Sequence, residues 1–302
     1  MNQSTWQTVI KLPKNYLKQD IVNFYLRDPQ QLSEQVSLST ISKGLVWQGH
    51  PALLSLIFEA QQVKAIILID GKVNENLPLF TAMIQRMLGL TQPIELFEKQ
   101  YKQDKQIGRL IKQQLGLRIP LTCSSFEAIV WAITGQQISV NAAIAIRRRL
   151  IQLFNIKHSS GLLCHPDANS FLTVTEQQLS QAGLSKNKAK TIKLLSEQIV
   201  NGELPLQQWE LAKTADINLI SNKLSAITGI GPWTVSYALL RGFGWLDGSL
   251  HGDVAVRRNL QRLLNSPEKL TANFTEQWLE QFKPWRALVA AHLWKMDTNK
   301  SY

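Results

Sequence analysis

The chain has 302 residues, of which 44% are hydrophobic and 18% charged, so it has room for more than one buried core. Its formal net charge is +11. Only two cysteines are present, Cys123 and Cys164, so a disulfide framework is not expected and a reducing compartment fits best. The N-terminal sequence lacks the charged-then-apolar layout of a signal peptide.

The positive charge is concentrated in the second part of the chain. Residues 1–97 carry eight Lys/Arg against seven Asp/Glu, whereas residues 98–302 carry 25 against 15, a net charge of +10. Such an asymmetry is expected where only one part binds a polyanion, and a merely soluble basic surface is the alternative.

Residues 1–97 mix strand and helix patterns and are predicted to form an α+β domain. Runs of branched apolar residues between turn residues predict strands at 8–12, 44–49, 52–59 and 64–69. Apolar residues at helical spacing predict helices over 17–25 and 78–88. No motif in residues 1–97 indicates a catalytic site.

From residue 98 onward the pattern is helical almost throughout, so residues 98–302 are predicted to form an all-helical domain. Polar residues that favour helix N-caps precede several of the apolar stripes. Helices are expected over 104–115, from Ser124 or Ser125, from Ser139, from Ser185, over 216–227 and 232–241, after Asp253, and over 284–296.

One stretch, from Ala128 to Ile146, contains no charged residue and is long enough to resemble a membrane span. Gly135, Gln136 and Gln137 lie near its centre, where hydrocarbon would leave their polar groups unpaired. We therefore predict a buried helix broken by a polar turn, and no membrane segment.

Three consecutive arginines, Arg147 to Arg149, follow in the next predicted helix. We expect them to end that helix, because positive charge complements the negative end of a helix dipole. A solvated basic helix end and a contact to DNA are two interpretations of this run.

Two glycines, Gly229 and Gly231, stand between helix-like segments and are followed by Pro232. Glycines at this spacing allow a tight turn and a close approach to a partner, and proline suits the first turn of a helix. Amides at such a helix start favour an anion such as a phosphate. We predict a hairpin between two helices that binds DNA.

A lone acid, Asp253, follows Gly231 by 22 residues and precedes another apolar helical pattern. An aspartate at a helix start is most often a cap. A helix N-terminus also favours a carboxylate, and an enzyme that breaks a glycosidic bond needs an anion near developing positive charge. The two roles can coexist in one residue.

Residues 227–235, Ile-Thr-Gly-Ile-Gly-Pro-Trp-Thr-Val, resemble the helix-hairpin-helix signature of the HhH-GPD DNA glycosylase superfamily, and Gly252-Asp253-x-x-x-Arg257 resembles its catalytic loop. The stretches 126–140, 183–189 and 284–287 are similar to the alkylbase, or 3-methyladenine, DNA glycosylase II branch (AlkA type). The resemblance is strong over 98–296 and looser over 1–97, where that branch has an α+β domain. It implies a helix-hairpin-helix DNA glycosylase fold.

The resemblance also implies a function: hydrolysis of the N-glycosidic bond of alkylated bases, such as 3-methyladenine and 7-methylguanine, in base excision repair. The partner would be double-stranded DNA containing damaged bases, which must be flipped out of the helix. A cytoplasmic monomer is expected, nucleoid-associated if the source is a bacterium. The same chemistry on hypoxanthine or uracil, and a non-catalytic DNA-binding protein, are alternatives.

Trp233 stands where members that also cut the DNA backbone carry a lysine, so the resemblance implies a monofunctional enzyme that uses water and has no AP lyase activity. Two cysteines are too few for an iron–sulfur cluster. No cofactor is expected beyond a structural Na⁺ or K⁺ held by the carbonyls of Ile227 and Ile230.

Further roles follow from the resemblance alone. Asp253 would stabilise the oxocarbenium-like sugar and orient the water. Trp233, Tyr237 and Trp285 match positions that line the base pocket, where each well-placed ring is worth about 0.5–2 kcal/mol to a cationic base. The alternative for each ring is a place in the core. Gln137 matches the wedge that fills the gap left by the flipped base. The expected DNA contacts are Gln136, Gln137, Gly229, Gly231 and Thr234.

Overall fold

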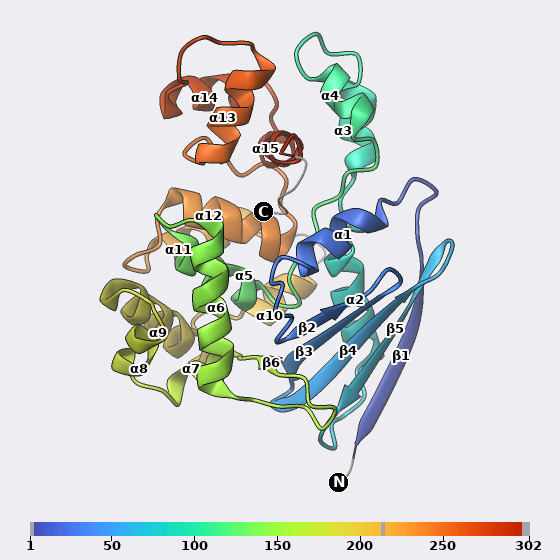
Figure 1. Cartoon of the computed structure of the whole chain (residues 1–302), viewed down its shortest axis with the longest axis vertical. Helices are drawn as coiled ribbons and strands as arrows, with labels where there is room; N and C mark the ends of the chain where they lie inside the picture. The colour runs from blue at the N-terminus through green and yellow to red at the C-terminus, as the bar shows by residue number, and fades with distance from the viewer. Residues whose placement is uncertain (1–2, 213–214, 298–302) are drawn as a thin grey trace.

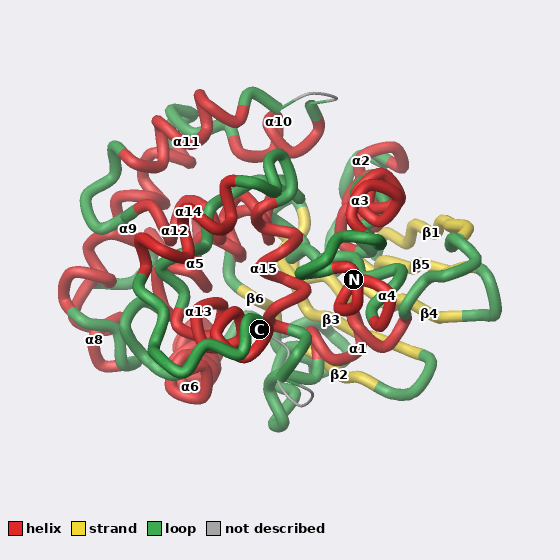
Figure 2. The backbone as a smooth tube through the Cα atoms, turned by 90° about the horizontal axis from the view of Figure 1, so that it is seen from above, coloured by secondary structure: helices red, strands yellow, loops and turns green. Residues whose placement is uncertain are grey.

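The computed structural model describes residues 3–212 and 215–297 and shows a mainly helical protein with one β-sheet (Figure 1). Seen from above, the strands gather on one side of the molecule (Figure 2). The predicted fold class, mostly α with an α+β N-terminal part, is confirmed. The domain boundary between residues 97 and 98 stays a prediction.

The sheet contains the four strand segments that the sequence predicts and two short ones that it does not. Its strands are ordered β1-β5-β4-β3-β2, each antiparallel to its neighbour. Their bounds are β1 Ser4–Lys11, β2 Glu34–Val36, β3 Thr40–Trp47, β4 His50–Phe58, β5 Gln62–Ile69 and β6 Cys164–His165.

Helices form most of the remaining described chain. Their bounds are α1 Lys18–Tyr25, α2 Leu77–Met87, α3 Ile94–Tyr101, α4 Gly108–Gln113, α5 Ser125–Gly135, α6 Val140–Phe154, α7 Ala168–Leu172, α8 Glu176–Gln181, α9 Lys186–Val200, α10 Leu206–Leu211, α11 Ile217–Ser225, α12 Pro232–Ala238, the π-helical turn η1 Leu239–Phe243, α13 Val254–Leu263, α14 Ala272–Glu280 and α15 Arg286–Trp294. The predicted caps at Ser124 and Asp253 are confirmed, because each side chain accepts a backbone amide of the first turn. Three predicted helix starts are N-caps of the same kind: Ser139, Ser185 and Asp216.

One face of the sheet packs against α2. Phe80 of this helix lies edge-on to Trp6 of β1 and to Trp47 of β3, with ring centroids 6.5 and 6.2 Å apart. Buried and half-buried residues alternate along β5, as expected for a strand with one face on a core. Burial of these large rings holds the helix to the sheet.

The last strand, β6, joins the helical part of the chain to the sheet. It pairs in parallel with β3, where Gly44 lies opposite Cys164. A Cβ at Gly44 would lie 2.1 Å from the carbonyl oxygen of Leu163, so only glycine permits this close approach. The sheet therefore contains residues from both predicted parts of the chain.

The uncharged stretch of the sequence forms two helices, as predicted. The first, α5, ends at Gly135, and α6 begins at Val140 after a turn that contains Gln137. Among the described residues, no helix is both long and apolar enough to cross a membrane.

The prediction that the arginine run ends its helix is wrong. The helix α6 continues to Phe154, because the apolar stripe continues beyond the arginines through Leu150 and Ile151, which are both buried. The side chains of Arg147 and Arg148 bond instead to acids of the first part of the chain, and the Nε of Arg149 donates to a backbone carbonyl 2.7 Å away.

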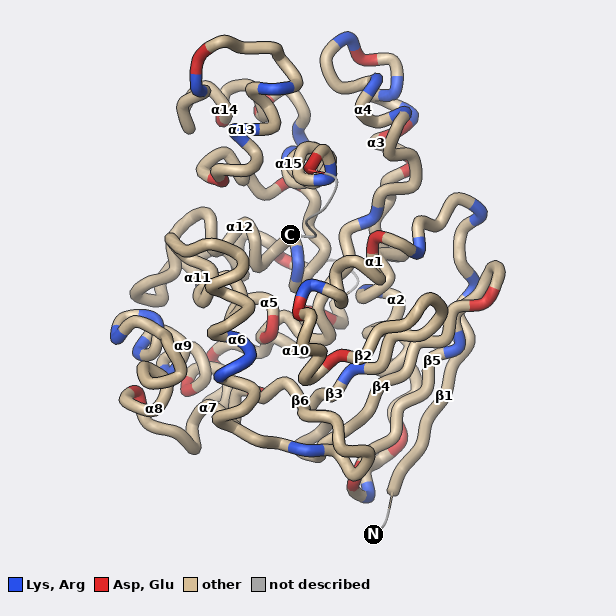
Figure 3. The backbone as a smooth tube through the Cα atoms, in the orientation of Figure 1, with Lys and Arg blue, Asp and Glu red and all other residues tan. Residues whose placement is uncertain are grey.

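These contacts form a buried charge cluster, defined here as Glu34, Lys43, Glu127 and Arg147. The Nζ of Lys43 lies 2.7 Å from Glu34 and 2.9 Å from Glu127, and Arg147 donates to both acids at up to 3.3 Å. Figure 3 shows the charged segments of β2, β3, α5 and α6 at this junction. Arg147 is thus neither a solvated helix end nor a DNA contact. Its buried ion pair with Glu34 of β2 joins α6 to the sheet.

Candidate active site

Asp253 lies at the N-terminus of α13, where four neutral donors hold its carboxylate. Its Oδ1 accepts the amides of Ala255 and Val256 at 2.9 and 3.0 Å, which confirms the predicted cap. The indole Nε1 of Trp294 donates to Oδ1 at 3.2 Å, and that of Trp233 donates to Oδ2 at 3.3 Å. Within the described part of the chain, Oδ2 accepts this one hydrogen bond and so has a lone pair for a further donor.

Aromatic rings surround this carboxylate on one side. Trp233 and Tyr237 stack, with centroids 5.2 Å apart and 28° between the ring planes. The ring of Trp294 lies 6.2 Å from that of Tyr237, and the Tyr237 hydroxyl accepts the Nε1 of Trp131 at 3.0 Å. Trp233 and Tyr237 come from α12, one helical turn apart, which is why they share a face.

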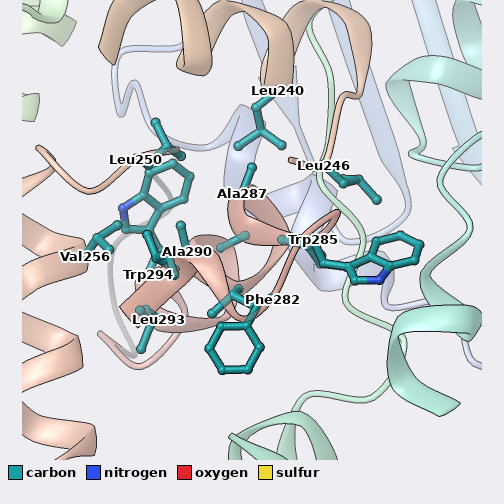
Figure 4. Packing of buried hydrophobic residues seen from close by; sticks show 14 of the residues in the cluster. Leu240, Leu246, Leu250, Val256, Phe282, Trp285, Ala287, Ala290, Leu293 and Trp294 are labelled. Atoms are coloured by element: carbon teal, nitrogen blue, oxygen red, sulfur yellow. The ribbon is translucent and has the colours of Figure 1, made fainter. Parts of the chain in front are cut away.

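Trp285 does not join this group. Its ring packs against Phe97 of α3, with centroids 6.0 Å apart, and its buried Nε1 has no partner among the described residues. Trp294 follows Trp285 by nine residues, which is two and a half helical turns, so the two rings leave α15 on opposite sides. Figure 4 shows this divergence. The assignment of Trp285 to the base pocket remains a prediction.

The hairpin between α11 and α12 depends on a glycine. Gly229 has a φ of +94°, and a Cβ there would lie 2.2 Å from the Thr191 hydroxyl oxygen of α9. That hydroxyl donates to the carbonyl of Thr228 at 2.9 Å and so fixes the hairpin on α9. Gly231 is exposed, and nothing lies near the position of its missing Cβ. A partner can therefore reach the backbone at Gly231.

A second turn, between α5 and α6, is tied to the hairpin. The side-chain Nε2 of Gln136 donates to the backbone carbonyl of Gly229 at 2.9 Å and to the hydroxyl of Thr234 at 2.8 Å. Lys188 of α9 donates to the carbonyl of Gln136 at 2.7 Å. Gln136 and the buried Thr234 thus brace the two turns, and a direct contact of either to DNA remains a prediction.

Gln137 is placed differently from its neighbour. It is exposed and has a left-handed φ of 57°, so it lies at the tip of the turn between the two helices. Bulky residues are uncommon in this conformation, which points to a local constraint. An exposed side chain at the tip of a braced turn is suited to enter a partner.

The two proposed cation ligands lie at the base of the hairpin. The side chains of Ile227 and Ile230 are buried, and the carbonyl of Ile227 accepts the amide of Ile230 at 3.0 Å. A carbonyl oxygen has a second lone pair, so this bond leaves room for a weak ligand contact. The cation remains a prediction.

A cavity of about 630 Å³ opens beside the aromatic rings. It lies between α1, the N-terminal half of α6, residues 117–120 and the end of α15, and Trp294 forms part of its wall. This volume is within the range of small-molecule sites. Since Trp294 also donates to Asp253, one side chain connects the cavity to the carboxylate.

Sequence reasoning missed two residues of this site. Trp294 lies outside the stretch 284–287 that carries the resemblance, and a helical pattern does not show which face of α15 meets Asp253. Arg27, which lines the cavity from the end of α1, belongs to the part of the chain that was predicted to have no chemistry. Only the packing of α1 beside α15 reveals it.

The chain is similar to known DNA repair proteins. The model of the HhH-GPD superfamily base excision DNA repair protein matches residues 130–284. A DNA-3-methyladenine glycosylase 2 of Escherichia coli is 28% identical over 62% of this chain, which spans 63% of that protein. A DNA-3-methyladenine glycosylase of Bacillus subtilis is 23% identical over 95% of this chain and 96% of its own length.

Among solved structures, a 3-methyladenine DNA-glycosylase from Archaeoglobus fulgidus has the same fold. Its TM-score is 0.79 at 21% identity, with 97% of this chain and 98% of that chain covered. The family model matches just over half of the sequence, and the matched residues include the braced hairpin and Asp253. The chain therefore belongs to the HhH-GPD superfamily of base excision DNA repair proteins.

Proposed function

We propose that this chain is a monofunctional DNA glycosylase that hydrolyses the N-glycosidic bond of alkylated bases, such as 3-methyladenine and 7-methylguanine, in double-stranded DNA. One observation carries the proposal: the half-buried carboxylate of Asp253 is held by neutral N–H donors beside a group of aromatic rings. A protein that only binds DNA needs neither feature. The names of the E. coli and B. subtilis relatives support the same activity.

The damaged base must leave the DNA helix before it can react, because its glycosidic bond is inaccessible within the stack. Gln137, at the tip of its turn, is the residue we propose to fill the gap. The basic second part of the chain and the exposed backbone at Gly231 would bind the phosphates. A single hairpin needs no symmetry partner, so we propose a monomer.

The flipped base would enter between the rings of Trp233, Tyr237 and Trp294 and the adjoining cavity. Alkylation at N3 or N7 makes a purine nucleoside cationic, and electron-rich ring faces attract cations. We add Trp294 to this pocket because it is a tryptophan of α15 that contacts Asp253, and the assignment of Trp285 stays a prediction.

The reaction breaks the bond between C1′ of the sugar and the base nitrogen, and the base leaves with the bonding electron pair. A cationic alkylated base thereby becomes neutral. The carboxylate of Asp253 would stabilise the positive charge that develops on the sugar, since charge stabilisation by fixed groups is a major part of catalysis. Water then adds to C1′ and loses its proton to the carboxylate or to solvent.

No covalent enzyme–DNA adduct is expected in this mechanism. Trp233 occupies the hairpin position where a lyase needs an amine, and its indole nitrogen donates to Asp253. An indole N–H is only a donor and cannot form a Schiff base.

The test is release of free 3-methyladenine from methylated duplex DNA by the wild type and by Asp253→Asn. We expect release by the wild type and strong loss in the variant, which keeps a good helix cap. Equal release by both proteins would overturn the role of Asp253. Borohydride trapping of a protein–DNA adduct would overturn the monofunctional mechanism, and DNA binding with no release by the wild type would leave only a DNA-binding protein.

A further inference from the structure

Arg27 lines the cavity and is held between two aromatic rings. It follows α1, and the central carbon of its guanidinium lies 4.5 Å from the ring centroid of Phe24 and 4.3 Å from that of Trp131. Stacking on two faces restricts the plane of the guanidinium, because both contacts favour a cation over the ring. This long side chain is therefore preorganised at the cavity wall.

The other basic residues of the cavity wall have polar partners. Lys295 bonds to Asp20 at 2.6 Å, and Arg118 donates to the carbonyl of Gln92 at 2.8 Å. Arg241 donates to the carbonyl of Pro120 at 2.9 Å. Each of these three residues thus bonds to a polar group of the protein.

Arg27 differs from them. Among the described residues its buried Nη1 has no hydrogen-bond partner, and no carboxylate lies within salt-bridge distance of its guanidinium. A buried donor on a charged group that lacks a partner is costly. Because Arg27 also lines the cavity, a ligand there would bring an acceptor to this guanidinium.

A chain of contacts links Arg27 to the proposed reaction site. The ring that stacks on it, Trp131, donates to the hydroxyl of Tyr237 at 3.0 Å. Tyr237 stacks on Trp233, which donates to Asp253. The guanidinium and the carboxylate thus belong to one aromatic assembly, with the cavity beside it.

We propose that Arg27 determines base specificity by donating a hydrogen bond to the carbonyl oxygen at position 6 of a flipped purine. This inference rests on the proposed glycosylase function. The base 7-methylguanine carries a carbonyl at position 6, whereas 3-methyladenine carries an amino group there. A guanidinium can donate a hydrogen bond to the carbonyl oxygen of 7-methylguanine. It cannot bond to the amino group of 3-methyladenine, since both groups are donors. Sites built around a buried hydrogen bond discriminate strongly against analogues that cannot make it.

The experiment uses one substrate that contains both bases. Duplex DNA methylated with dimethyl sulfate is incubated with the wild type, Arg27→Met and Arg27→Gln, and the released 7-methylguanine and 3-methyladenine are separated and counted. We expect the ratio of 7-methylguanine to 3-methyladenine to fall about tenfold or more in Arg27→Met. Arg27→Gln keeps an N–H donor, so its ratio should fall less. Arg109→Met, which removes an exposed arginine of α4, is the control for lost charge.

The outcomes separate the inference from the function on which it rests. Release of neither base by the wild type would overturn both. Release of both bases with the same ratio in the wild type, Arg27→Met and Arg27→Gln would overturn the role of Arg27 alone, as would an equal fall in Arg109→Met. Thermal unfolding of each variant identifies any variant that does not fold. If one Arg27 variant does not fold, the ratio of 7-methylguanine to 3-methyladenine released by the other tests the role of Arg27.

Discussion

Two carboxylates near helix N-termini, Asp253 and Glu127, are held in opposite ways. Glu127 of α5 is buried, and its Oε1 lies 2.9 Å from the Nζ of Lys43 and 3.3 Å from Arg147. Burial alone would raise the pKa of Glu127, but Lys43, with His165 and Arg147, holds that pKa at about 2. Around Asp253 the four donors are neutral indole and amide groups.

The difference separates a structural carboxylate, Glu127, from the proposed reactive one, Asp253. The charge of Glu127 is already compensated by cations, so it has little attraction left for another positive group. Asp253 is also held by four hydrogen bonds, but among the described residues none of these donors is a cation. Its negative charge therefore remains available to stabilise a positive sugar. The predictions below test this contrast.

The largest effect is expected from Asp253→Asn. Single-turnover release of 3-methyladenine should fall on the order of 10²–10⁴-fold, because the amide has no negative charge to offer the sugar. The melting temperature should change little, since asparagine is a good N-cap. A large loss of stability with unchanged release per folded molecule would reverse the assignment.

Glu127→Gln should show the converse pattern. Removing one acid leaves Lys43 and Arg147 buried around Glu34 with an unbalanced charge, and the free energy of unfolding should fall by about 3–5 kcal/mol. Urea unfolding measures this loss. As a matched control, Glu176→Gln removes an exposed acid from the first turn of α8 and should cost far less.

A smaller effect distinguishes the two tryptophans of α15. Trp294→Phe removes the N–H that donates to Asp253, and base release should fall about tenfold or more. Trp285→Phe removes an N–H that has no partner among the described residues, so release per folded molecule should stay near the wild-type rate. Equal losses in both variants would support the predicted place of Trp285 in the pocket.

A last effect, spread gradually over several pH units, concerns two buried histidines. Burial lowers the pKa of His165 to about 4 and that of His292 to about 3, against 6.5 for the free side chain. As the pH falls below 6.5, the unfolded chain therefore binds protons that the folded chain does not, and stability should decline steadily down to about pH 4. Urea unfolding between pH 7 and 4.5 checks this, and a flat profile would contradict it.

Local patterns predicted much of this fold because they follow from local physics. The caps at Ser124, Ser139 and Asp253 satisfy amides only three residues or fewer away. The strands 52–59 and 64–69 are long apolar runs separated by a short turn. Each such feature depends on neighbouring residues, and the structure confirms them.

What the sequence did not reveal depends on contacts between distant residues. Arg147 bonds to Glu34, 113 residues away, and nothing near either residue indicates the other. The bond between Trp294 and Asp253 depends on how α15 packs beside α13, and Gly44 is required only because β6 approaches β3. Such pairs are set by tertiary packing, which periodicity in one segment does not encode.

The buried charge cluster also affects the order in which the chain can fold during synthesis. The chain emerges from the ribosome with its N-terminus first, so β2 and β3 are made before α5 and α6. Lys43 and Glu34 then have each other as partners, while Glu127 and Arg147 come 84 and 113 residues after the residues they join. We expect the nascent sheet to remain open to water at this point until α6 has been made. Maturation of the N-terminal sheet thus waits for the helix that follows the proposed DNA wedge.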